Sequence, residues 1–418
     1  MVDHGAERFR EAALKAVLWL ALVAFSAPVL AQSVLPPEQV VRTVLENLPQ
    51  VRASAINIDL ARAGKSRLDA GTHEWTVRTG LSRRTDQIGG RYNEQDVALE
   101  RSVRWFGKAA QDRAIGDKGI VVATSGHEDA WHEAGRTLLT DWFSALREMS
   151  ATERLDEQVG LAAQLRAIAE KRVKAGDAAQ IELLQADTES ARVGALLQQA
   201  QLRREQALQQ LATNYPGLPV PHAAPLPIPV ASTESGDWWR DKITSDNHEL
   251  ELAQGEADLL GLQAARVSSE RMPDPTIGVR AGRERDGQER LVSISILFTL
   301  PGAGRSADRD GAVAKAGMAT QRAAMTQMKV SAAAQRVVTD SQRSLTLWQT
   351  MQRIADQSAQ QSATMMRAYT LGEASLTDAL TNRRMAMDAA LAAESAQIDA
   401  LAAQARLSLD AHLLWSID

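Results

Sequence analysis

The sequence predicts a mainly α-helical protein with a small β part, built from two similar halves. A glycine turn occurs twice, at Gly176 in KAGDAAQIE and at Gly372 in TLGEASLTD, and 372 − 176 = 196 positions separate the two glycines. A long proline-free stretch precedes each glycine, at residues 108–172 and 303–368. Two pairs of segments with alternating apolar residues precede those stretches. A unit repeated over nearly half of the chain determines the architecture before any chemistry is considered.

The first residues indicate a secretory signal peptide at 1–31. Arg8, Arg10 and Lys15 precede an apolar run at 16–25 that is too short to span a bilayer, and small residues ending at Ala31 suit cleavage. The alternative is a retained membrane anchor. No later stretch is long and apolar enough for a transmembrane helix, so we expect an exported protein that enters a membrane, if at all, as strands.

Composition excludes several classes of protein. The chain has no cysteine, which excludes a disulfide framework, a thiolate metal site and a lipid-modified N-terminal cysteine. A net charge of −5 without a basic stripe argues against nucleic acid as a partner. The G-x-S-x-G and H-E-x-x-H motifs and a phosphate loop followed by lysine are all missing from the sequence. We therefore expect neither an enzyme nor a cofactor.

A proline-rich linker divides the mature chain. Six of the thirteen prolines lie between Pro216 and Pro229, so residues 216–235 are expected to be extended. This places a first repeat at 32–215 and a second at 236–418. Each repeat is expected to begin with a helix, at 36–69 with an interruption at Leu48-Pro49, and at 246–271.

Each repeat then contains a predicted β-hairpin. The strands are expected at 75–81 and 95–105, with Val97, Leu99, Val103 and Trp105 on one face, and at 276–281 and 291–300. Alternation over about 10 residues suits a tilted membrane-spanning strand. Four strands cannot close a barrel, so spanning strands would require several protomers to share one. The alternative is a pair of soluble hairpins packed on the helices.

A second long helix is expected after each glycine turn, at 179–213 and 375–415. The first carries a coiled-coil-like seam, and the second carries an almost continuous alanine face that permits close helix packing. The seam comprises Val193, Leu197, Ala200, Ala207, Leu208 and Leu211. The alanine face comprises Ala386, Ala389, Ala390, Ala393, Ala396 and Ala400.

This order of elements resembles the TolC-like outer-membrane efflux family (outer membrane factors) over essentially the whole mature chain. The features that carry the resemblance are the signal peptide, the duplicated order, the linker, both glycine turns and the strand-to-helix segment Leu300-Pro301-Gly302-Ala303-Gly304-Arg305. The resemblance implies duplicated long-helix hairpins that form an α-barrel, and four strands per protomer in a twelve-stranded transmembrane β-barrel. It also implies a homotrimer in the outer membrane of a Gram-negative cell, in contact with its lipid and with the helices in the periplasm. A periplasmic adaptor (membrane fusion protein) and an inner-membrane RND-type pump would be its partners.

Within that family the chain looks most like the CzcC-like heavy-metal branch. The support is Met272-Pro273-Asp274-Pro275, the compact loops and the start without a lipidated cysteine. The implied cargo is a cation of the cobalt, nickel, zinc, cadmium and copper class. A drug-efflux or type I secretion duct is the alternative cargo assignment. A periplasmic coiled-coil adaptor and a purely structural coiled-coil protein are alternatives from other classes, although neither explains two hairpins.

The glycine turns are the first candidate site. A helix reversal needs a residue that tolerates positive φ, which glycine provides. The resemblance implies that the adaptor contacts these tips; the alternative is that the glycines only close the hairpins. The implied contact residues are Ala175, Gly176, Asp177, Leu371, Gly372, Glu373 and Ser375.

The acidic residues that follow each turn are the second candidate site. Glu182 and Asp378 lie six positions after their glycines, and the resemblance implies that they face the narrow periplasmic end of the pore. Threefold symmetry would make six carboxylates there, and such rings select and gate cations. Tyr369 matches the position of a tyrosine that helps to latch the closed periplasmic end of the pore in the best-known family members. Thr381 and Ala374 replace a second aspartate and an arginine, so we expect a looser or different latch. The alternative is a solvated helix face.

The histidines do not predict a metal site. His127 and His132 are five positions apart, which places them more than 100° apart around a helix. The remaining ones considered are isolated in the sequence: His73, His222, His248 and His412.

Overall fold

The structure is a computed structural model that describes residues 34–222 and 225–417. The expected signal peptide lies outside the described residues. The chain forms two compact units, and each contains parts of both repeats. We call Pro49–Glu133 with Asp241–Ala334 the strand unit, because it holds all the described strands. The tip unit holds the described residues up to Leu48 and those within Ala134–Arg240 and Gln335–Asp418, and it includes both glycine turns.

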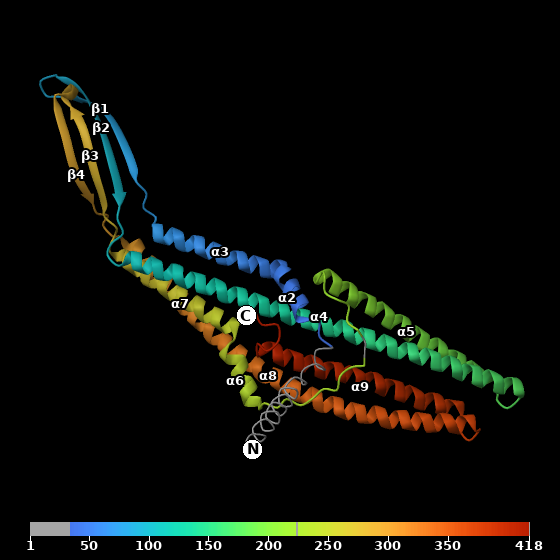
Figure 1. The fold of residues 1–418 in the computed structure, drawn as a ribbon. Coiled ribbons are helices and arrows are strands. Elements are labelled where there is room, and N and C mark those ends of the chain that lie inside the picture. Colours follow the sequence, from blue (N-terminus) through green and yellow to red (C-terminus); the bar gives the residue numbers. More distant parts are fainter. Residues whose placement is uncertain (1–33, 223–224, 418) are drawn as a thin grey trace, which may run out of the picture. The chain divides into compact units, whose positions relative to one another are not determined.

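The duplicated order predicted from the sequence is confirmed (Figure 1). The first repeat comprises α2 (Glu38–Asn47), α3 (Pro49–Ala70), β1 (Thr76–Thr85), β2 (Arg91–Ser102), α4 (Lys108–Ala175) and α5 (Gln180–Asn214). The second comprises α6 (Gly236–Ser245), α7 (His248–Ser268), β3 (Thr276–Glu284), β4 (Glu289–Leu297), α8 (Ala303–Thr370) and α9 (Leu376–Asp410), with short 3₁₀ turns at Ser269–Arg271 and Arg285–Gly287. Helices α4 and α8 both have 68 residues, and α5 and α9 both have 35. Among the described residues, no helix combines the length and the apolar character needed to cross a membrane.

The opening helix of each repeat is broken near the same position. The break in the first repeat is at Leu48, between α2 and α3, as expected. In the second repeat the structure adds α6, which the sequence interpretation missed, and the break falls just before α7. Different residues start the two later helices. Pro49 suits a first helical turn, and the side chain of Asn247 accepts a 2.9 Å bond from the Leu250 N–H.

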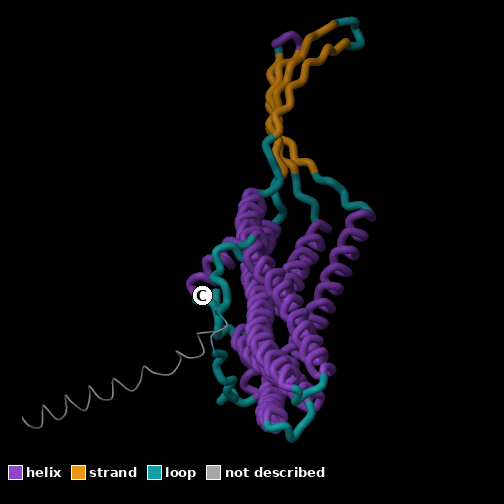
Figure 2. Tube along the Cα trace, turned by 90° about the vertical axis from the view of Figure 1, so that its right-hand side faces the viewer, coloured by secondary structure: helices purple, strands orange, loops and turns teal. Residues whose placement is uncertain are grey.

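The two hairpins join into one antiparallel sheet of order β1-β2-β3-β4 (Figure 2). The central pair, β2 and β3, comes from different repeats and aligns Leu99 with Val279 and Val97 with Ala281. At the end of this pair the hydroxyls of Ser102 and Thr276 are 2.7 Å apart. Pairing between the repeats therefore makes the sheet, and the hairpins are not separate pieces packed on helices.

The strand ends differ from the sequence prediction. At the hairpin turns all four strands extend beyond the predicted limits, to Thr85, Arg91, Glu284 and Glu289. At their other ends β2 and β4 stop before the predicted limits. Val103 and Trp105 lie beyond β2. The Val103 N–H still bonds to the Pro275 carbonyl at 2.8 Å, but Pro275 has no N–H to donate in return. The Trp105 N–H bonds to the Asp274 side-chain carboxylate at 2.8 Å and not to a strand backbone. The last strand ends at Leu297, not Leu300. Leu297 pairs with Thr276, and the residue before Thr276 is a proline, which cannot donate to a ladder.

Small residues pack the helices of the tip unit. On the predicted alanine face of α9, Ala393, Ala396 and Ala400 are buried. On the predicted seam of α5, Val193 and Ala200 are buried. The linker lies along α9, where Gln397 donates to the Pro227 carbonyl at 3.0 Å and Gln404 donates to the Val230 carbonyl at 2.6 Å. The described part of the extended linker does not belong to a β-sheet, and side chains of α9 provide hydrogen bonds to some of its backbone carbonyl groups.

Candidate functional site at the helical tips

The two tips have the same backbone geometry. In the first, Gly176 has φ +79°, its N–H bonds to the Val173 carbonyl at 3.1 Å, and the next N–H reaches the Arg172 carbonyl at 2.9 Å. In the second, Gly372 has φ +81°, its N–H bonds to the Tyr369 carbonyl at 3.1 Å, and the next N–H reaches the Ala368 carbonyl at 2.9 Å. This bond pair is the Schellman motif, which ends a helix with a left-handed residue.

The predicted tip residues are all exposed. A Cβ at Gly176 or Gly372 would meet no atom within 4 Å, so the positive φ, and not lack of space, requires glycine there. Leu371 is an apolar side chain with 66% of its surface exposed. The exposed set comprises Ala175, Gly176, Asp177, Leu371, Gly372, Glu373 and Ser375.

A tyrosine from the second repeat is bonded to an acid from the first. Tyr369 is fully buried, and its hydroxyl donates to a Glu182 carboxylate oxygen at 3.2 Å. Arg172 lies over the ring, with its guanidinium carbon 4.7 Å from the ring centroid, and donates to the Tyr369 carbonyl at 3.2 Å. We call these three residues the tip latch. It combines a charge-assisted hydrogen bond with a cation–π contact between the repeats.

The surroundings of Tyr369 keep its hydroxyl protonated. Burial raises the pKa of Tyr369, the negative charge of Glu182 raises it further, and the positive charge of Arg172 only partly opposes them. The net direction is upward, so the hydroxyl is a hydrogen-bond donor to Glu182 at neutral pH.

An apolar cluster lies around the tip latch. It takes side chains from α4, α5, α8 and α9, so all four helices of the two hairpins pack together at this end. Its buried members, besides Tyr369, are Leu165, Ala169, Ala186, Leu376, Ala379 and Leu380.

Asp378 has a different role from Glu182, although both lie six positions after a glycine. Its backbone N–H bonds to the Ser375 hydroxyl at 3.1 Å, and that hydroxyl donates back to the Asp378 carboxylate at 2.7 Å. Ser375 is the N-cap of α9. Asp378 is exposed and completes a capping arrangement within its own helix.

The sequence interpretation missed two participating residues. Arg172 supplies a guanidinium to this site. The family resemblance had led us to expect a looser or different latch, because Ala374 stands where relatives have an arginine. Its counterpart 196 positions later is Ala368, and this asymmetry between the repeats is the signal that could have identified it. Thr381 is exposed and donates only to the Thr377 carbonyl of its own helix, at 2.8 Å.

The other missed residue is Glu189, which is 4% exposed on α5. It accepts 2.8 Å bonds from Arg192 of its own helix and from Arg384 of α9. Burial raises the pKa of Glu189, but the bonds and charges of the two arginines outweigh it and hold the pKa below its usual range. Glu189 and Arg384 therefore form a further polar link between the repeats, less than one turn beyond Ala186 of the apolar cluster.

The sheet has one apolar and one polar face. Register places Val77, Leu99, Val279 and Ile294 in one row and Thr79, Val97, Ala281 and Val292 in the next on the same face. These side chains are mostly exposed, with Val292 and Ile294 both at 76%. The opposite face carries ion pairs such as Arg78–Glu100 and Arg280–Asp96, each at 3.1 Å. An amphipathic sheet thus leaves its apolar face uncovered by the described part of the chain.

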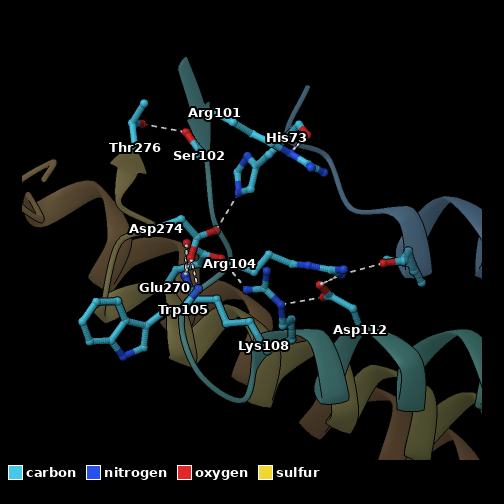
Figure 3. Close-up of polar contacts among 12 residues, drawn as sticks. His73, Arg101, Ser102, Arg104, Trp105, Lys108, Asp112, Glu270, Asp274 and Thr276 are labelled. Carbon is cyan, nitrogen blue, oxygen red and sulfur yellow. Dashed lines mark hydrogen bonds and ion pairs between the residues drawn. The ribbon is translucent and has the colours of Figure 1, made fainter. Parts of the chain in front are cut away.

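A buried polar cluster joins the sheet to the helices of the strand unit (Figure 3). The Lys108 side chain is 1% exposed, and its Nζ lies 2.8 Å from Asp274 Oδ1 and 3.1 Å from Glu270 Oε2. The second Asp274 oxygen lies 2.8 Å from His73. Burial raises the pKa of Asp274, but bonds from Lys108, His73 and the Trp105 backbone outweigh it and bring the pKa to about 2. Asp274 of the Met-Pro-Asp-Pro segment is therefore a structural anchor for the start of β3.

Three solved structures, two of them of outer-membrane channels, show the same fold. The chain superposes on OprN with a TM-score of 0.78 at 15% identity, covering 90% of each chain. It superposes on Campylobacter jejuni CmeC with a TM-score of 0.72 at 15% identity, covering 91% of this chain and 86% of CmeC. For CusC, whose structures concern transmembrane channel formation, the score is 0.68 at 13% identity, covering 93% and 95%.

No protein-family model and no curated protein sequence matches the chain. The structural likeness nevertheless covers nearly the full length of both partners in each pair. The chain has the TolC-like fold, with long duplicated helices and four antiparallel strands, which confirms the expected fold class.

Proposed function

We propose that the protein is the outer-membrane channel of a tripartite efflux system and catalyses no reaction. The observation that carries this proposal is the uncovered apolar face of the sheet. Apolar residues facing outward and charged residues facing inward are the pattern of a strand wall between lipid and an aqueous lumen. The strands have 9 to 12 residues, which matches the roughly 9–11 residues that a tilted strand needs to cross a bilayer.

The unpaired sheet edges support a shared barrel. Among the described strands, β1 and β4 each have a neighbour on one side only. Edge strands of nine or ten residues invite pairing with another chain. Pairing β4 of one copy with β1 of the next around a threefold axis removes every edge and gives twelve strands, and this is the arrangement that we propose.

The exposed tips support docking to a periplasmic adaptor that connects the channel to an inner-membrane RND-type pump. In this proposal the helices form a periplasmic tunnel, and the tip latch holds its end closed. Glu182 and Asp378 line the narrow end as rings of carboxylates, with Tyr369 as the latching side chain. Opening then requires Tyr369 to separate from Glu182.

The finer proposal for the cargo is a heavy-metal cation of the cobalt, nickel, zinc, cadmium or copper class. Its support is the sequence resemblance to the CzcC-like branch. Asp274 anchors the sheet, so this residue is no evidence for cargo binding. Drug export is the competing proposal. A deletion strain that becomes sensitive to metal salts and not to drugs supports the first, and the reverse result supports the second.

The barrel is tested by placing a charge on either face of one strand. An Ile294→Asp variant puts a carboxylate toward lipid and should reduce the outer-membrane trimer, since charged side chains on the lipid face of a strand destabilise a barrel, although a carboxylate costs less than the roughly 2–4 kcal/mol of an arginine or lysine at mid-bilayer. Ser293→Asp on the polar face is the matched control and should leave the trimer intact. The readout is membrane fractionation and native-gel trimer yield. Equal yields, or a water-soluble monomer in the unaltered protein, would refute the proposal.

The gate is tested separately by conductance in planar bilayers. Glu182→Gln weakens the tip latch and removes ring charge, whereas Asp378→Asn removes ring charge without altering the tip latch, and its amide oxygen can still accept from Ser375. Both should alter cation selectivity, and Glu182→Gln alone should also raise the open probability. Currents identical to those of the unaltered channel would contradict a gate at these residues and leave the barrel proposal standing.

A further inference from the structure

Helix α7 lies antiparallel along the first part of α4 within the strand unit. Lys118 and Asp258 form a 2.8 Å ion pair, and a Cβ at Gly126 would lie 3.7 Å from Leu252. In an antiparallel pair, residue numbers rise along one helix as they fall along the other. Continuing from these two contacts places Glu128 of α4 opposite the first turn of α7.

Three potential metal ligands meet at that point. The Nδ1 atom of His248 lies 3.6 Å from a Glu128 carboxylate oxygen and 3.6 Å from a Glu251 carboxylate oxygen. One donor atom from each of the three residues lies within 4.8 Å of the other two. His248 begins α7, so His248 and Glu251 face α4 from one helical turn.

The surroundings hold the imidazole in place. His132, which is 8% exposed, packs edge-on against the His248 ring with centroids 6.2 Å apart. The side chain of His248 is 18% exposed and that of Glu251 is 46% exposed, so the group is open to solvent on the Glu251 side. His127 lies elsewhere, 2.9 Å from the Ser54 hydroxyl of α3. His248 is thus isolated in the sequence but not in space.

We propose that Glu128, His248 and Glu251 bind one first-row divalent transition-metal ion such as Zn²⁺. Donors about 2.0–2.1 Å from a tetrahedral ion are separated from each other by roughly 3.3 Å. The 3.6 Å separations are close to this value and longer than a normal hydrogen bond. One imidazole with two carboxylates favours zinc, cobalt or nickel over the all-oxygen sets that calcium and magnesium prefer.

A bound ion would pin the start of α7 to α4. It would also neutralise the negative charge that two carboxylates bring together beside the helix N-terminus. This site belongs to the strand unit and does not depend on the cargo of the channel. Its failure and the failure of the proposed function are therefore distinguishable.

The test uses the full-length protein in detergent, freed of metal with EDTA and titrated with ZnCl₂ by calorimetry. We expect one ion per chain, and a loss of affinity of at least about tenfold in His248→Ala, Glu128→Gln and Glu251→Gln. The matched control is Glu249→Gln, because Glu249 lies in the same turn but pairs with Lys329 at 2.6 Å. His222→Ala controls for an exposed histidine elsewhere. Both controls should bind as the unaltered protein does.

A second measurement separates binding from folding. Thermal unfolding in EDTA should be similar for His248→Ala and the unaltered protein, whereas added Zn²⁺ should raise the unfolding temperature of the latter only. Cobalt at the same site should give the visible absorption of a tetrahedral ion. Unchanged Zn²⁺ affinity in His248→Ala, equal losses in the two controls, or equal stabilisation by Mg²⁺ would each overturn the proposal.

Discussion

The two helical tips share one backbone and differ in what their acidic residues do. Both end their first helix in a Schellman turn at a positive-φ glycine, and both carry an acid six positions later. Glu182 accepts a bond from Tyr369 of the other repeat, whereas Asp378 completes the cap of its own helix through Ser375. The difference arises at the N-cap. Ala179 at the start of α5 has no side-chain oxygen, and Ser375 at the start of α9 does.

This difference shows how two copies of one unit come to bond the same kind of residue differently. Where a serine caps the helix, the acid joins the local cap and the turn becomes self-contained. Where an alanine stands at the cap, the acid is available to a partner from the other repeat. Duplication therefore preserves the turn, and one side chain three residues before the acid determines what the acid bonds to.

The largest effect is expected from removing the tyrosine of the tip latch. Tyr369→Ala deletes a fully buried aromatic side chain and should lower the free energy of local opening by about 3–5 kcal/mol. Hydrogen exchange of peptides covering both tips measures this opening. Leu371→Ala, two positions away and exposed, is the control and should change little. Equal protection in both variants would show that the tips do not depend on Tyr369.

The next effect isolates the bond from the packing. Tyr369→Phe keeps the ring and should cost about 1.5–3 kcal/mol, because it leaves the Glu182 carboxylate without its donor. A double-mutant cycle with Glu182→Gln should show coupling, whereas a cycle of Tyr369→Phe with Asp378→Asn should be additive. Additivity in both cycles would remove the distinction between the two acids.

The same bond predicts a pH dependence. The folded-state pKa of Tyr369 is raised above its unfolded value of about 10, so its contribution is complete below pH 10 and is lost as pH rises through the folded pKa. Protection of the tips should therefore fall in alkaline solution. Tyr369→Phe should remove the Tyr369 part of that fall, and a similar alkaline slope in the variant would contradict this assignment.

The turns themselves should respond alike. Gly176→Val and Gly372→Val both force a β-branched residue into the left-handed region, at a cost of roughly 1–2 kcal/mol or more. Gly→Asn at either position should cost much less, because asparagine tolerates that region. Export assays of both sets of variants separate two causes. A defect already present in the Asn variants points to lost adaptor docking, whereas a defect in the Val variants alone points to turn strain. A clear difference between Gly176→Val and Gly372→Val would show that the tips are not equivalent in backbone.

The smallest effect concerns the caps. Ser375→Ala should destabilise the start of α9 by about 1 kcal/mol, and Ala179→Ser should stabilise the start of α5 by a similar or smaller amount. Hydrogen exchange of the first turns of α5 and α9 provides the measurement. The serine at 179 should also weaken the Tyr369–Glu182 coupling if Glu182 turns to the new cap. Unchanged coupling would show that Tyr369 holds Glu182 regardless of the cap.

The sequence predicted the fold and the position of the tips well, and predicted the polar contacts poorly. Gly176 and Gly372 could be read from the sequence because a positive φ is a local demand that glycine meets. The ends of β2 and β4 could not, since Val103 and Leu300 continue an alternating pattern and only the position of Pro275 ends their pairing. Arg172 was missed because its partner, Tyr369, lies in the other repeat.

By itself the sequence determined the local order: two helix-turn-helix hairpins, two amphipathic strand pairs and an extended linker. Apolar periodicity, glycine and proline determine backbone conformation over a few residues, so their effects can be predicted without knowing the tertiary neighbours. Tertiary structure alone decided that β2 pairs with β3, that Tyr369 reaches Glu182 and that His248 meets Glu128. These partners are more than 100 positions apart, and only helix and strand packing sets which distant side chains face each other.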